Sequence, residues 1–333
     1  MYTINYNVSI RAVAAAAPTH VLDNEVYAAT VEDKRFRRRI LYTGIKRRRA
    51  VVGRQRTSDL ASLAAAAILK KLEWDPASVG VLIFITQSPD IYAPSTAMLI
   101  QSKLQLTQDI LAFDVNLGCT GFTSGVQILS GILNQTKGRG LLLMGDCQHY
   151  APGTEYDADS ILFGDGGAAV AMEYDSAAVP IPCAQMTDGA RFKVLYSAPG
   201  RGRIMDGNEI VLFSLNEVVD SINHFHEHYG ISREKVDFYA LHQAQKIIVE
   251  GVSQNCGLAL EKVLTAYQEY GNTSSASIPF ALCANTDRLQ GRRLKIFTCG
   301  FGIGLAWSSA LLTLDGSCIL PLIESDHAYP NLF

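Results

Sequence analysis

Short apolar runs alternate with amphipathic stretches along most of the chain. The apolar runs predict buried strands over residues 79–87, 110–116, 140–147, 161–174, 236–243, 293–300 and 304–314. The amphipathic stretches predict helices over residues 59–74, 94–104, 214–229, 245–256 and 274–286. Because helices alternate with continuously apolar strands, we expect an α/β fold in which helices cover both faces of each sheet. Residues 197–209, which contain glycine and several charges, are expected to form the longest loop.

Two segments of the first half recur faintly in the second half. Residues 117–129 align with residues 270–282 through a shared Gly-x-Thr and a run of small residues. Residues 163–172 align with residues 301–310 through a shared Phe-Gly-x-Gly-x-Ala. Each match alone is weak, but the two occur in the same order, which indicates an internal duplication.

The duplication predicts two related halves, residues 1–175 and 176–333. If the halves face each other across a pseudo-twofold axis, Cys119 and Asn272 occupy equivalent helix starts that point at one site. The cysteine is therefore interpreted as one member of a pair.

Cys119 lies between an apolar run and the start of a predicted helix, in DVNLGCTGFTSGVQIL. A helix N-terminus presents unpaired N–H groups and a positive dipole end, so we expect it to favour the nucleophilic thiolate. The backbone N–H of Cys119 is also available to an oxyanion hole. The other cysteines are interpreted as buried, inert thiols: Cys147, Cys183, Cys256, Cys283, Cys299 and Cys318.

Two further polar residues are candidates for the same site. His242 directly follows a predicted strand, and sites in α/β sheets lie at the carboxyl ends of strands. Asn272 has two interpretations, either an ordinary cap or turn residue or an amide that donates to a developing oxyanion. We predict no metal site, because the histidines of NHFHEH (residues 223–228) alternate along a helix and do not share one face.

Composition is that of an ordinary globular enzyme, with 48% hydrophobic and 18% charged residues. No apolar run reaches the ~18 residues of a membrane span, and the N-terminus lacks the pattern of a signal peptide. The 7 cysteines include no C-x-x-C pair that would indicate zinc or a disulfide framework. We therefore expect a cytoplasmic protein with reduced thiols and no membrane association.

Positive charge is concentrated in one segment, residues 34–56, although the net charge of the chain is −3. This segment contains 11 of the 29 lysines and arginines. It is either a solvated basic face or a docking surface that attracts an acidic partner. Nucleic acid is not the expected partner, because no nucleic-acid-binding motif accompanies the charge.

These features together resemble the β-ketoacyl-acyl carrier protein synthase III group of the thiolase superfamily. The resemblance spans nearly the whole chain and is carried, in family order, by TGIKRRR, YAPSTAMLIQSKL, FDVNLGCTGF, LFGDGGAAV, LHQAQ, YGNTSSASIPFAL and GFGIGLAWSSALL. It implies a five-layered αβαβα thiolase-like fold of two duplicated halves, usually a homodimer. This implication agrees with the duplication seen in the sequence.

The resemblance also implies a covalent acyltransferase mechanism without a metal or redox cofactor. Cys119 would take an acyl group from an acyl-CoA or acyl-carrier thioester. His242 and Asn272 would then stabilise the enolate formed by decarboxylation of a malonyl-carrier thioester, and this enolate would attack the acyl-enzyme. The backbone N–H groups of Cys119 and Ile303 would form the oxyanion hole. Acyl carrier protein is acidic, so Arg47, Arg48 and Arg49 are expected to dock it.

Two departures from the family pattern bear on the substrate. Members that use a coenzyme A starter often carry an arginine where this chain has Ile247, which favours a carrier-bound donor. Members with short starters often have a bulky phenylalanine where this chain has Ala93, before Pro94. We therefore expect a roomier acyl pocket that accepts a longer or bulkier acyl group. Ala93 would provide this space across the dimer interface. These features favour a relative from specialised, polyketide-like metabolism.

Two alternatives to a condensing enzyme stay open. The first is a relative that passes the acyl group from Cys119 to an oxygen or nitrogen nucleophile. The second is a non-catalytic partner subunit. Release of CO2 from malonyl-carrier protein separates condensation from both, and a covalent acyl adduct separates the two enzymes from the non-catalytic subunit.

Overall fold

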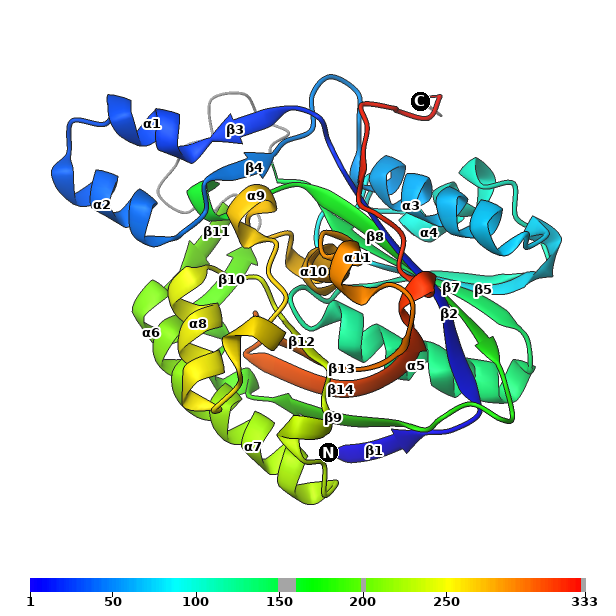
Figure 1. Cartoon of the computed structure of the whole chain (residues 1–333). Helices are drawn as coiled ribbons and strands as arrows, with labels where there is room; N and C mark the ends of the chain where they lie inside the picture. The colour runs from blue at the N-terminus through cyan, green and yellow to red at the C-terminus, as the bar shows by residue number, and fades with distance from the viewer. Residues whose placement is uncertain (149–159, 199–201, 331–333) are drawn as a thin grey trace.

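Two large β-sheets and three layers of helices form the frame of the protein, which we describe from a computed structural model (Figure 1). Two small two-stranded sheets, one of which pairs residues 21–23 with residues 47–49, lie outside this frame. The structure describes residues 1–148, 160–198 and 202–330. The layers run helix, sheet, helix, sheet, helix, so the predicted α/β fold and its five-layered αβαβα arrangement are confirmed.

The first sheet has six strands in the order β15-β2-β8-β7-β5-β6. Its strands are β2 (Val8–Ala17), β5 (Val79–Ile85), β6 (Leu111–Val115), β7 (Arg139–Asp146), β8 (Gly166–Tyr174) and β15 (Ile323–Glu324). Strand β5 is parallel to both β6 and β7, whereas β8 is antiparallel to β7 and β2.

The second sheet has five strands in the order β1-β9-β14-β13-β12. Its strands are β1 (Tyr2–Asn5), β9 (Ile181–Thr187), β12 (Phe238–Leu241), β13 (Arg293–Gly302) and β14 (Ala306–Asp315). The run β9-β14-β13-β12 repeats the run β2-β8-β7-β5 of the first sheet, with the same parallel and antiparallel pairings. The sequence repeat therefore corresponds to a repeat of topology.

The predicted boundary near residue 175 lies between β8 and β9. Two terminal strands nevertheless cross between the halves, because β1 pairs with β9 and β15 pairs with β2. Residues 1–175 and 176–333 are thus interlocked through both ends of the chain.

Two central helices, α5 (Gly121–Thr136) and α10 (Ser277–Cys283), contact both sheets and form the middle layer. The outer face of the first sheet is covered by α3 (Thr57–Leu72) and α4 (Thr96–Lys103). The outer face of the second sheet packs against α7 (Val219–His228) and α8 (Lys246–Asn255).

Alternating side chains divide the core into three layers. In β2, Val13 belongs to the central cluster between the sheets, whereas Ala14 faces α3. In β13, Ile296 belongs to the central cluster, whereas Phe297 faces α7 and α8. Since both faces of each sheet are buried, the strands are apolar at nearly every position, as the sequence predicted.

The remaining described elements lie around this frame. They are β3 (Val21–Asp23), α1 (Asn24–Thr30), α2 (Lys34–Tyr42), β4 (Arg47–Arg49), β10 (Leu195–Ala198), β11 (Gly202–Met205), α6 (Gly207–Phe213), α9 (Tyr267–Tyr270) and α11 (Thr286–Leu289). Helices α1 and α2 project from one corner of the molecule (Figure 1). Within the described ranges, no helix combines the length and apolar character needed to cross a bilayer.

The segment expected to be the longest loop is largely structured, and this expectation is wrong. Strands β10 and β11 form an antiparallel pair, and α6 begins at Gly207. The side chain of Asp206 caps α6 by accepting hydrogen bonds from the backbone N–H groups of Asn208 and Glu209, both at 3.1 Å. The glycines and charges of the segment obscured this capping signal.

Candidate active site

The three predicted catalytic residues come from equivalent ends of elements in the two halves. Cys119 lies in the turn from β6 to α5, immediately before the N-cap residue Thr120. His242 directly follows β12, and Asn272 follows α9 just before the turn into α10. All three line one narrow cavity of about 60 Å³. The fold therefore brings together residues that are up to 153 positions apart, counting from Cys119 to Asn272.

Glycines let strand β13 end directly against the nucleophile. At Gly302, which has a φ of +151°, an added Cβ would lie 2.8 Å from the Sγ of Cys119. An added Cβ at Gly300 would lie 2.5 Å from the carbonyl oxygen of Cys119. This close approach places the backbone N–H of Ile303 where it hydrogen-bonds the Cys119 sulfur. The two N–H groups predicted for the oxyanion hole, those of Cys119 and Ile303, thus both face the reacting atom.

The Cys119 thiol is protonated in the free protein. Burial raises its pKa to about 11, and the nearby Asp146 carboxylate contributes in the same direction. The N–H groups of Ile303 and Cys119 and the charge of Arg203 lower the pKa but do not compensate for burial. The direction of this shift is opposite to the thiolate expected from the helix N-terminus, because burial is the largest influence on the thiol.

His242 is fully neutral at physiological pH, since burial lowers its pKa to about 3. Its Nδ1 lies 2.7 Å from the Oγ of Ser277, and its ring meets Phe301 edge to face at 5.5 Å. The hydrogen bond to Ser277 engages Nδ1, so Nε2 is the nitrogen left for a substrate. Ser277 is the first residue of α10, and the sequence offered no signal for this role.

Asn272 is held by backbone and side-chain hydrogen bonds. Its N–H donates to the Leu162 carbonyl at 2.8 Å, and its carbonyl accepts from Gly164 N–H at 3.1 Å. Its side-chain Oδ1 accepts from Ser274 N–H at 2.9 Å. Because this bond fixes the amide by its oxygen, the Nδ2 group remains as the donor toward the cavity.

Arg48, expected to dock an acidic partner, is instead completely buried, with 0% exposure. Its guanidinium donates to Asn24 Oδ1 at 3.0 Å and to the carbonyls of Ser160 and Phe163 at 2.9 and 3.2 Å. Residues 160–163 form the segment with which Asn272 pairs. Arg48 therefore positions the catalytic loop, and the predicted docking role is wrong because no partner reaches a buried side chain.

The two other arginines of β4, Arg49 and Arg47, differ from each other in exposure. Arg49 is only 8% exposed, forms a 2.8 Å ion pair with Glu324 and stacks on Tyr270. Arg47 is half-exposed and pairs with Glu269 at 3.1 Å. The docking expectation is therefore wrong for Arg49 as well, and Arg47 is the one arginine of this strand that faces solvent.

The structure also shows the exposure of Ala93 and of the cysteines predicted to be inert. Ala93 is exposed in the loop before α4 and does not line the cavity around Cys119. Its predicted place in an acyl pocket therefore requires a second subunit. Cys318 is only partly buried, unlike the other predicted inert cysteines, and all the cysteines are free thiols.

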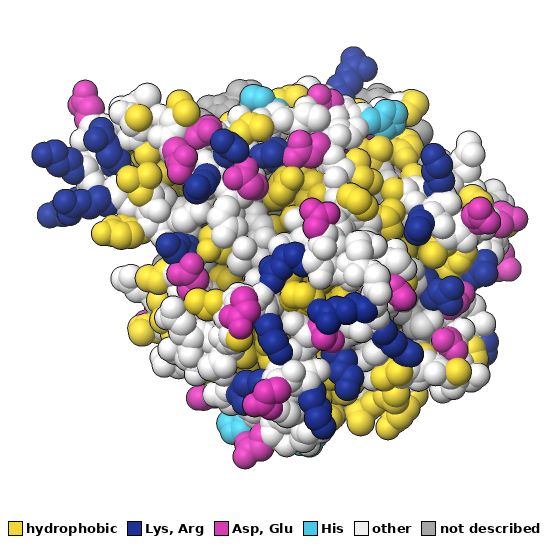
Figure 2. Space-filling view, in the orientation of Figure 1, with side chains coloured by type: hydrophobic (Ala, Val, Ile, Leu, Met, Phe, Trp, Pro, Cys, Tyr) yellow, Lys and Arg dark blue, Asp and Glu magenta, His cyan; other side chains and the backbone are white. Residues whose placement is uncertain are grey.

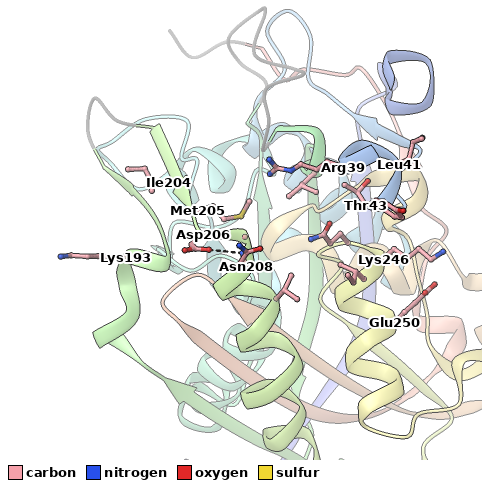
Figure 3. A pocket seen from close by; sticks show the side chains of 16 residues that line it. Arg39, Leu41, Thr43, Lys193, Ile204, Met205, Asp206, Asn208, Lys246 and Glu250 are labelled. Atoms are coloured by element: carbon pink, nitrogen blue, oxygen red, sulfur yellow. Dashed lines mark hydrogen bonds between the residues drawn. The ribbon is translucent and has the colours of Figure 1, made fainter. Parts of the chain in front are cut away.

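A wide cleft leads from the surface to the catalytic cavity (Figure 3). It has a volume of about 1250 Å³ and shares Leu162, Met205, Gly207 and Gln245 with the cavity around Cys119. Lys193 lies on one side of the cleft and Arg39 and Lys246 lie on the other (Figure 3). The cleft therefore connects the cavity around Cys119 with the surface of the molecule.

Comparison with known proteins identifies the class of protein that this fold and site define. Residues 113–189 match the family model of 3-oxoacyl-[acyl-carrier-protein] synthase III, and residues 226–314 match the model of its C-terminal part. The chain belongs to the β-ketoacyl-[acyl-carrier-protein] synthase III family and is an acyltransferase of the ketosynthase III type.

Two relatives and one solved structure illustrate the similarity. The Clostridium perfringens β-ketoacyl-[acyl-carrier-protein] synthase III is 32% identical over 89% of this chain and 96% of its own length. The Neisseria gonorrhoeae protein of the same name is 31% identical over 81% and 88% of the two chains. The structure of a 3-oxoacyl-(acyl-carrier protein) synthase from Burkholderia xenovorans superposes with a TM-score of 0.92 at 28% identity, covering 98% of this chain and 99% of that one.

Proposed function

We propose that this protein transfers an acyl group from a thioester to Cys119 and then condenses it with a malonyl-carrier thioester, in fatty-acid or polyketide-like biosynthesis. The observation that carries this proposal is the single cavity lined by Cys119, His242 and Asn272. No metal or redox cofactor takes part in the proposed chemistry.

In the first half-reaction, the Cys119 sulfur attacks the thioester carbonyl of the donor. The negative charge on the carbonyl oxygen is stabilised by the N–H groups of Cys119 and Ile303. Collapse of the intermediate expels the donor thiol, which takes up the proton that Cys119 loses. Because the pKa of the thiol is raised, this proton must leave as the new carbon–sulfur bond forms.

In the second half-reaction, the malonyl thioester loses CO2 and leaves an enolate. Its oxygen accepts hydrogen bonds from Nε2–H of His242 and Nδ2–H of Asn272. A pKa of about 3 keeps the His242 ring neutral, and a Ser277 hydroxyl that donates to Nδ1 places the ring proton on Nε2. The enolate carbon then attacks the acyl-Cys119 carbonyl, forms the carbon–carbon bond and releases the cysteine sulfur.

Intact-protein mass spectrometry with a panel of acyl-CoA and acyl-carrier thioesters tests the first half-reaction. We expect an acyl adduct on the wild type and no adduct on Cys119→Ala. The control variant Cys318→Ala should be acylated normally. Subsequent addition of malonyl-carrier protein should release CO2 and remove the adduct. Transfer of the acyl group to an alcohol or amine without CO2 release would contradict condensation. The absence of any adduct would contradict both the acylation of Cys119 and the condensation that follows it.

The partner carrier protein is proposed to dock at the mouth of the cleft. Helix α2 carries Lys34, Arg35, Arg37, Arg38 and Arg39, and Figure 2 shows this projecting tip as a concentration of positive side chains. Arg39 also lines the cleft, as do the exposed residues Lys193 and Lys246. The acidic Asp206 and Glu250 line it too, but Asp206 is engaged in capping α6. This surface fits the acidic carrier better than β4 does, because its cations surround the path to Cys119.

Charge reversal tests the docking surface. Lys193→Glu and Lys246→Glu should raise KM for a malonyl-carrier substrate and leave the turnover of a small thioester analogue unchanged. Arg47→Glu is the matched control, since Arg47 is exposed but does not line the cleft. An equal rise in KM for all three variants would contradict the proposed surface.

We also propose a homodimer formed along β6. Within the described residues, β6 pairs only with β5, so its outer edge is free for a second copy. The adjacent Leu111, Met98 and Tyr92 are 52%, 50% and 104% exposed. Such a dimer would carry the loop of Ala93 toward the partner's acyl pocket, where its small side chain leaves room for a bulky acyl group. Light scattering should give a mass near twice 36.2 kDa, and Leu111→Asp should reduce it to that of one chain.

A further inference from the structure

The C-terminal segment, residues 316–330, runs back over the first sheet toward the catalytic loop of Asn272. It follows the residues that match the family, 226–314, and is drawn in red in Figure 1. Strand β15 of this segment pairs in parallel with the end of β2, and the N–H of Ser325 donates to the carbonyl of Ala17 at 3.0 Å. The segment is therefore fixed along the sheet by backbone hydrogen bonds.

Glu324, the last residue of β15, connects this segment with the catalytic loop. Its Oε1 accepts a hydrogen bond from Nη2 of Arg49 at 2.8 Å and another from the hydroxyl of Tyr270 at 3.0 Å. Arg49 also donates to the carbonyl of Glu269 at 3.0 Å, and its guanidinium lies 4.8 Å from the centroid of the Tyr270 ring. Each of the three side chains thus contacts the other two, and Tyr270 is two residues before Asn272.

A single glycine separates Tyr270 from Asn272. Gly271 has a φ of +65°, and an added Cβ would lie 2.9 Å from the carbonyl oxygen of Leu162 and 3.0 Å from Cγ of Arg48. Glycine adopts this conformation readily but restrains its own backbone little. The anchors on either side of Gly271 therefore decide where the amide of Asn272 lies.

We propose that Glu324 and Arg49 are positioning residues for the condensation step, which hold Tyr270 and, through it, the Nδ2 group of Asn272 in place for the enolate. This inference rests on the proposed function. It goes beyond that function by giving the C-terminal segment a part in decarboxylation and none in the acylation of Cys119.

The acylation step depends on other parts of the fold. Cys119 lies in the turn from β6 to α5, and the N–H of Ile303, at the end of β13, hydrogen-bonds its sulfur. The contacts of Glu324 instead converge on the residues just before Asn272. A displacement of Tyr270 should therefore disturb the enolate donor and leave the nucleophile and its oxyanion hole unchanged.

The expected effect on the rate is larger than the strength of the contacts themselves suggests. The side chain of Glu324 is 40% exposed, so its ion pair with Arg49 is screened by solvent and adds little to stability. A catalytic donor, in contrast, loses much of its effect when it moves by a fraction of an ångström. We therefore expect about a three- to tenfold slower decarboxylation without Glu324 in a protein that is still folded.

Kinetics of Glu324→Ala test the inference against a matched control, Asp326→Ala. Asp326 is a second carboxylate of the same segment and accepts from the N–H of Thr19 at 3.2 Å, away from Tyr270 and Arg49. We expect Glu324→Ala to lower kcat for CO2 release from malonyl-carrier protein about three- to tenfold, with KM and the rate of Cys119 acylation unchanged. Asp326→Ala should leave all three quantities at their wild-type values.

Two further variants identify the atoms that matter. Glu324→Gln keeps an oxygen that accepts from Tyr270 and Arg49, so it should restore most of the lost kcat. Tyr270→Phe keeps the ring but removes the hydroxyl, so it should lower kcat in the same direction as Glu324→Ala. Because both changes break the same contact, the double variant should be no slower than Glu324→Ala alone.

Hydrogen exchange supplies a readout that does not depend on activity. The N–H of Asn272 donates to the carbonyl of Leu162 at 2.8 Å, and the N–H of Ser274 donates to Oδ1 of Asn272 at 2.9 Å. In Glu324→Ala, peptides that cover residues 267–276 should exchange faster than in the wild type. In Asp326→Ala, the same peptides should exchange at the wild-type rate.

The outcomes distinguish this inference from the proposed function. If Glu324→Ala releases CO2 at the wild-type rate, or if acylation falls as much as CO2 release, the positioning role is overturned while condensation stands. Unchanged exchange over residues 267–276 likewise overturns it. If acylated wild-type protein releases no CO2 from malonyl-carrier protein, the proposed function fails, and the positioning role in condensation fails with it.

Discussion

The two halves of the protein present equivalent ends of strands to one site, but these ends carry different chemistry. Strand β12 in the second half ends at His242, which faces the catalytic cavity. Its counterpart β5 in the first half ends before Thr86 and Gln87, and Gln87 lines a separate cavity of about 440 Å³ that does not include His242. The turns into the central helices differ in the same way, with Cys119 before α5 and Asn272 before α10.

The two halves contribute different groups to this one site. The first half carries Cys119, whereas the second carries His242, Asn272 and Ile303, whose N–H hydrogen-bonds the Cys119 sulfur. A buried network joins them, because Asp146 accepts from Gln87 N–H and also from the Ser275 hydroxyl of the second half, at 3.3 Å. The duplicated topology thus fixes the positions, and the residue placed at each position decides the chemistry.

Removal of the second half's donors should give the largest effect. His242→Ala and Asn272→Ala should each lower CO2 release from malonyl-carrier protein by about 10²- to 10³-fold, because the enolate loses a preorganised donor. Acylation of Cys119 should fall far less in Asn272→Ala, since the oxyanion hole of that step lies elsewhere. Radiometric CO2 release and intact mass, measured on the same samples, compare the two steps. Equal losses in both steps for Asn272→Ala would contradict a role of Asn272 in decarboxylation alone.

Loss of Arg48 should weaken the contact that holds Asn272. Arg48→Met leaves the acceptors on Asn24, Ser160 and Phe163 without their donor, and we expect unfolding to become easier by about 3 kcal/mol. Arg47→Met, its neighbour on β4, should cost less than about 1 kcal/mol because its ion pairs are exposed. Chemical denaturation measures both values. Equal midpoints for the two variants would show that Arg48 does not support the loop.

The protonation of Cys119 predicts how its reactivity depends on pH. Below a pKa of about 11 the thiolate fraction rises tenfold for each pH unit, so alkylation by iodoacetamide should rise about 100-fold from pH 7 to pH 9. Peptide mapping assigns the modification to Cys119. Protonation of His242 adds no second transition in this range, because burial lowers its pKa to about 3. A plateau reached below pH 9 would mean that the helix dipole, not burial, dominates the thiol.

The sequence predicted most of the frame, because both sheets are buried on both faces and their strands are continuously apolar. Two central strands, β2 and β9, were nevertheless not predicted. The run VSIRAVAAAA of β2 contains alanines that favour helices, yet it forms a strand between β8 and β15. Packing of small side chains against α3 and α10 overrides the intrinsic preference.

The sequence predicted those residues of the candidate site that lie at the ends of helices or strands and within recognisable motifs. Cys119, His242 and Asn272 belong to this class. The burial of Arg48 was not predictable, because a run of arginines looks the same in a sequence whether its side chains face solvent or are buried. The roles of Ser277 and Arg203 depend on contacts between segments far apart in the chain, which no local pattern encodes.

Gly118, the residue before Cys119, should give the smallest effect when it is substituted. The φ of Gly118 lies outside the left-handed region, so Gly118→Ala adds no backbone strain, and its Cβ would meet the side-chain ends of Gln87 and Ile303. Because these ends can rotate, we expect a stability loss of about 1 kcal/mol. The displaced Gln87 and Ile303 lie beside the nucleophile, so acylation of Cys119 should fall less than about tenfold.

The matched control for this substitution is Gly131→Ala on helix α5. No atom lies within 4 Å of a Cβ added at Gly131, and alanine favours a helix over glycine by about 0.5–1 kcal/mol, so stability should rise slightly. Acylation rates for a series of chain lengths separate the two variants. If Gly118→Ala and Gly131→Ala acylate at the same rate for every donor, the contacts of Gly118 with Gln87 and Ile303 do not influence the nucleophile.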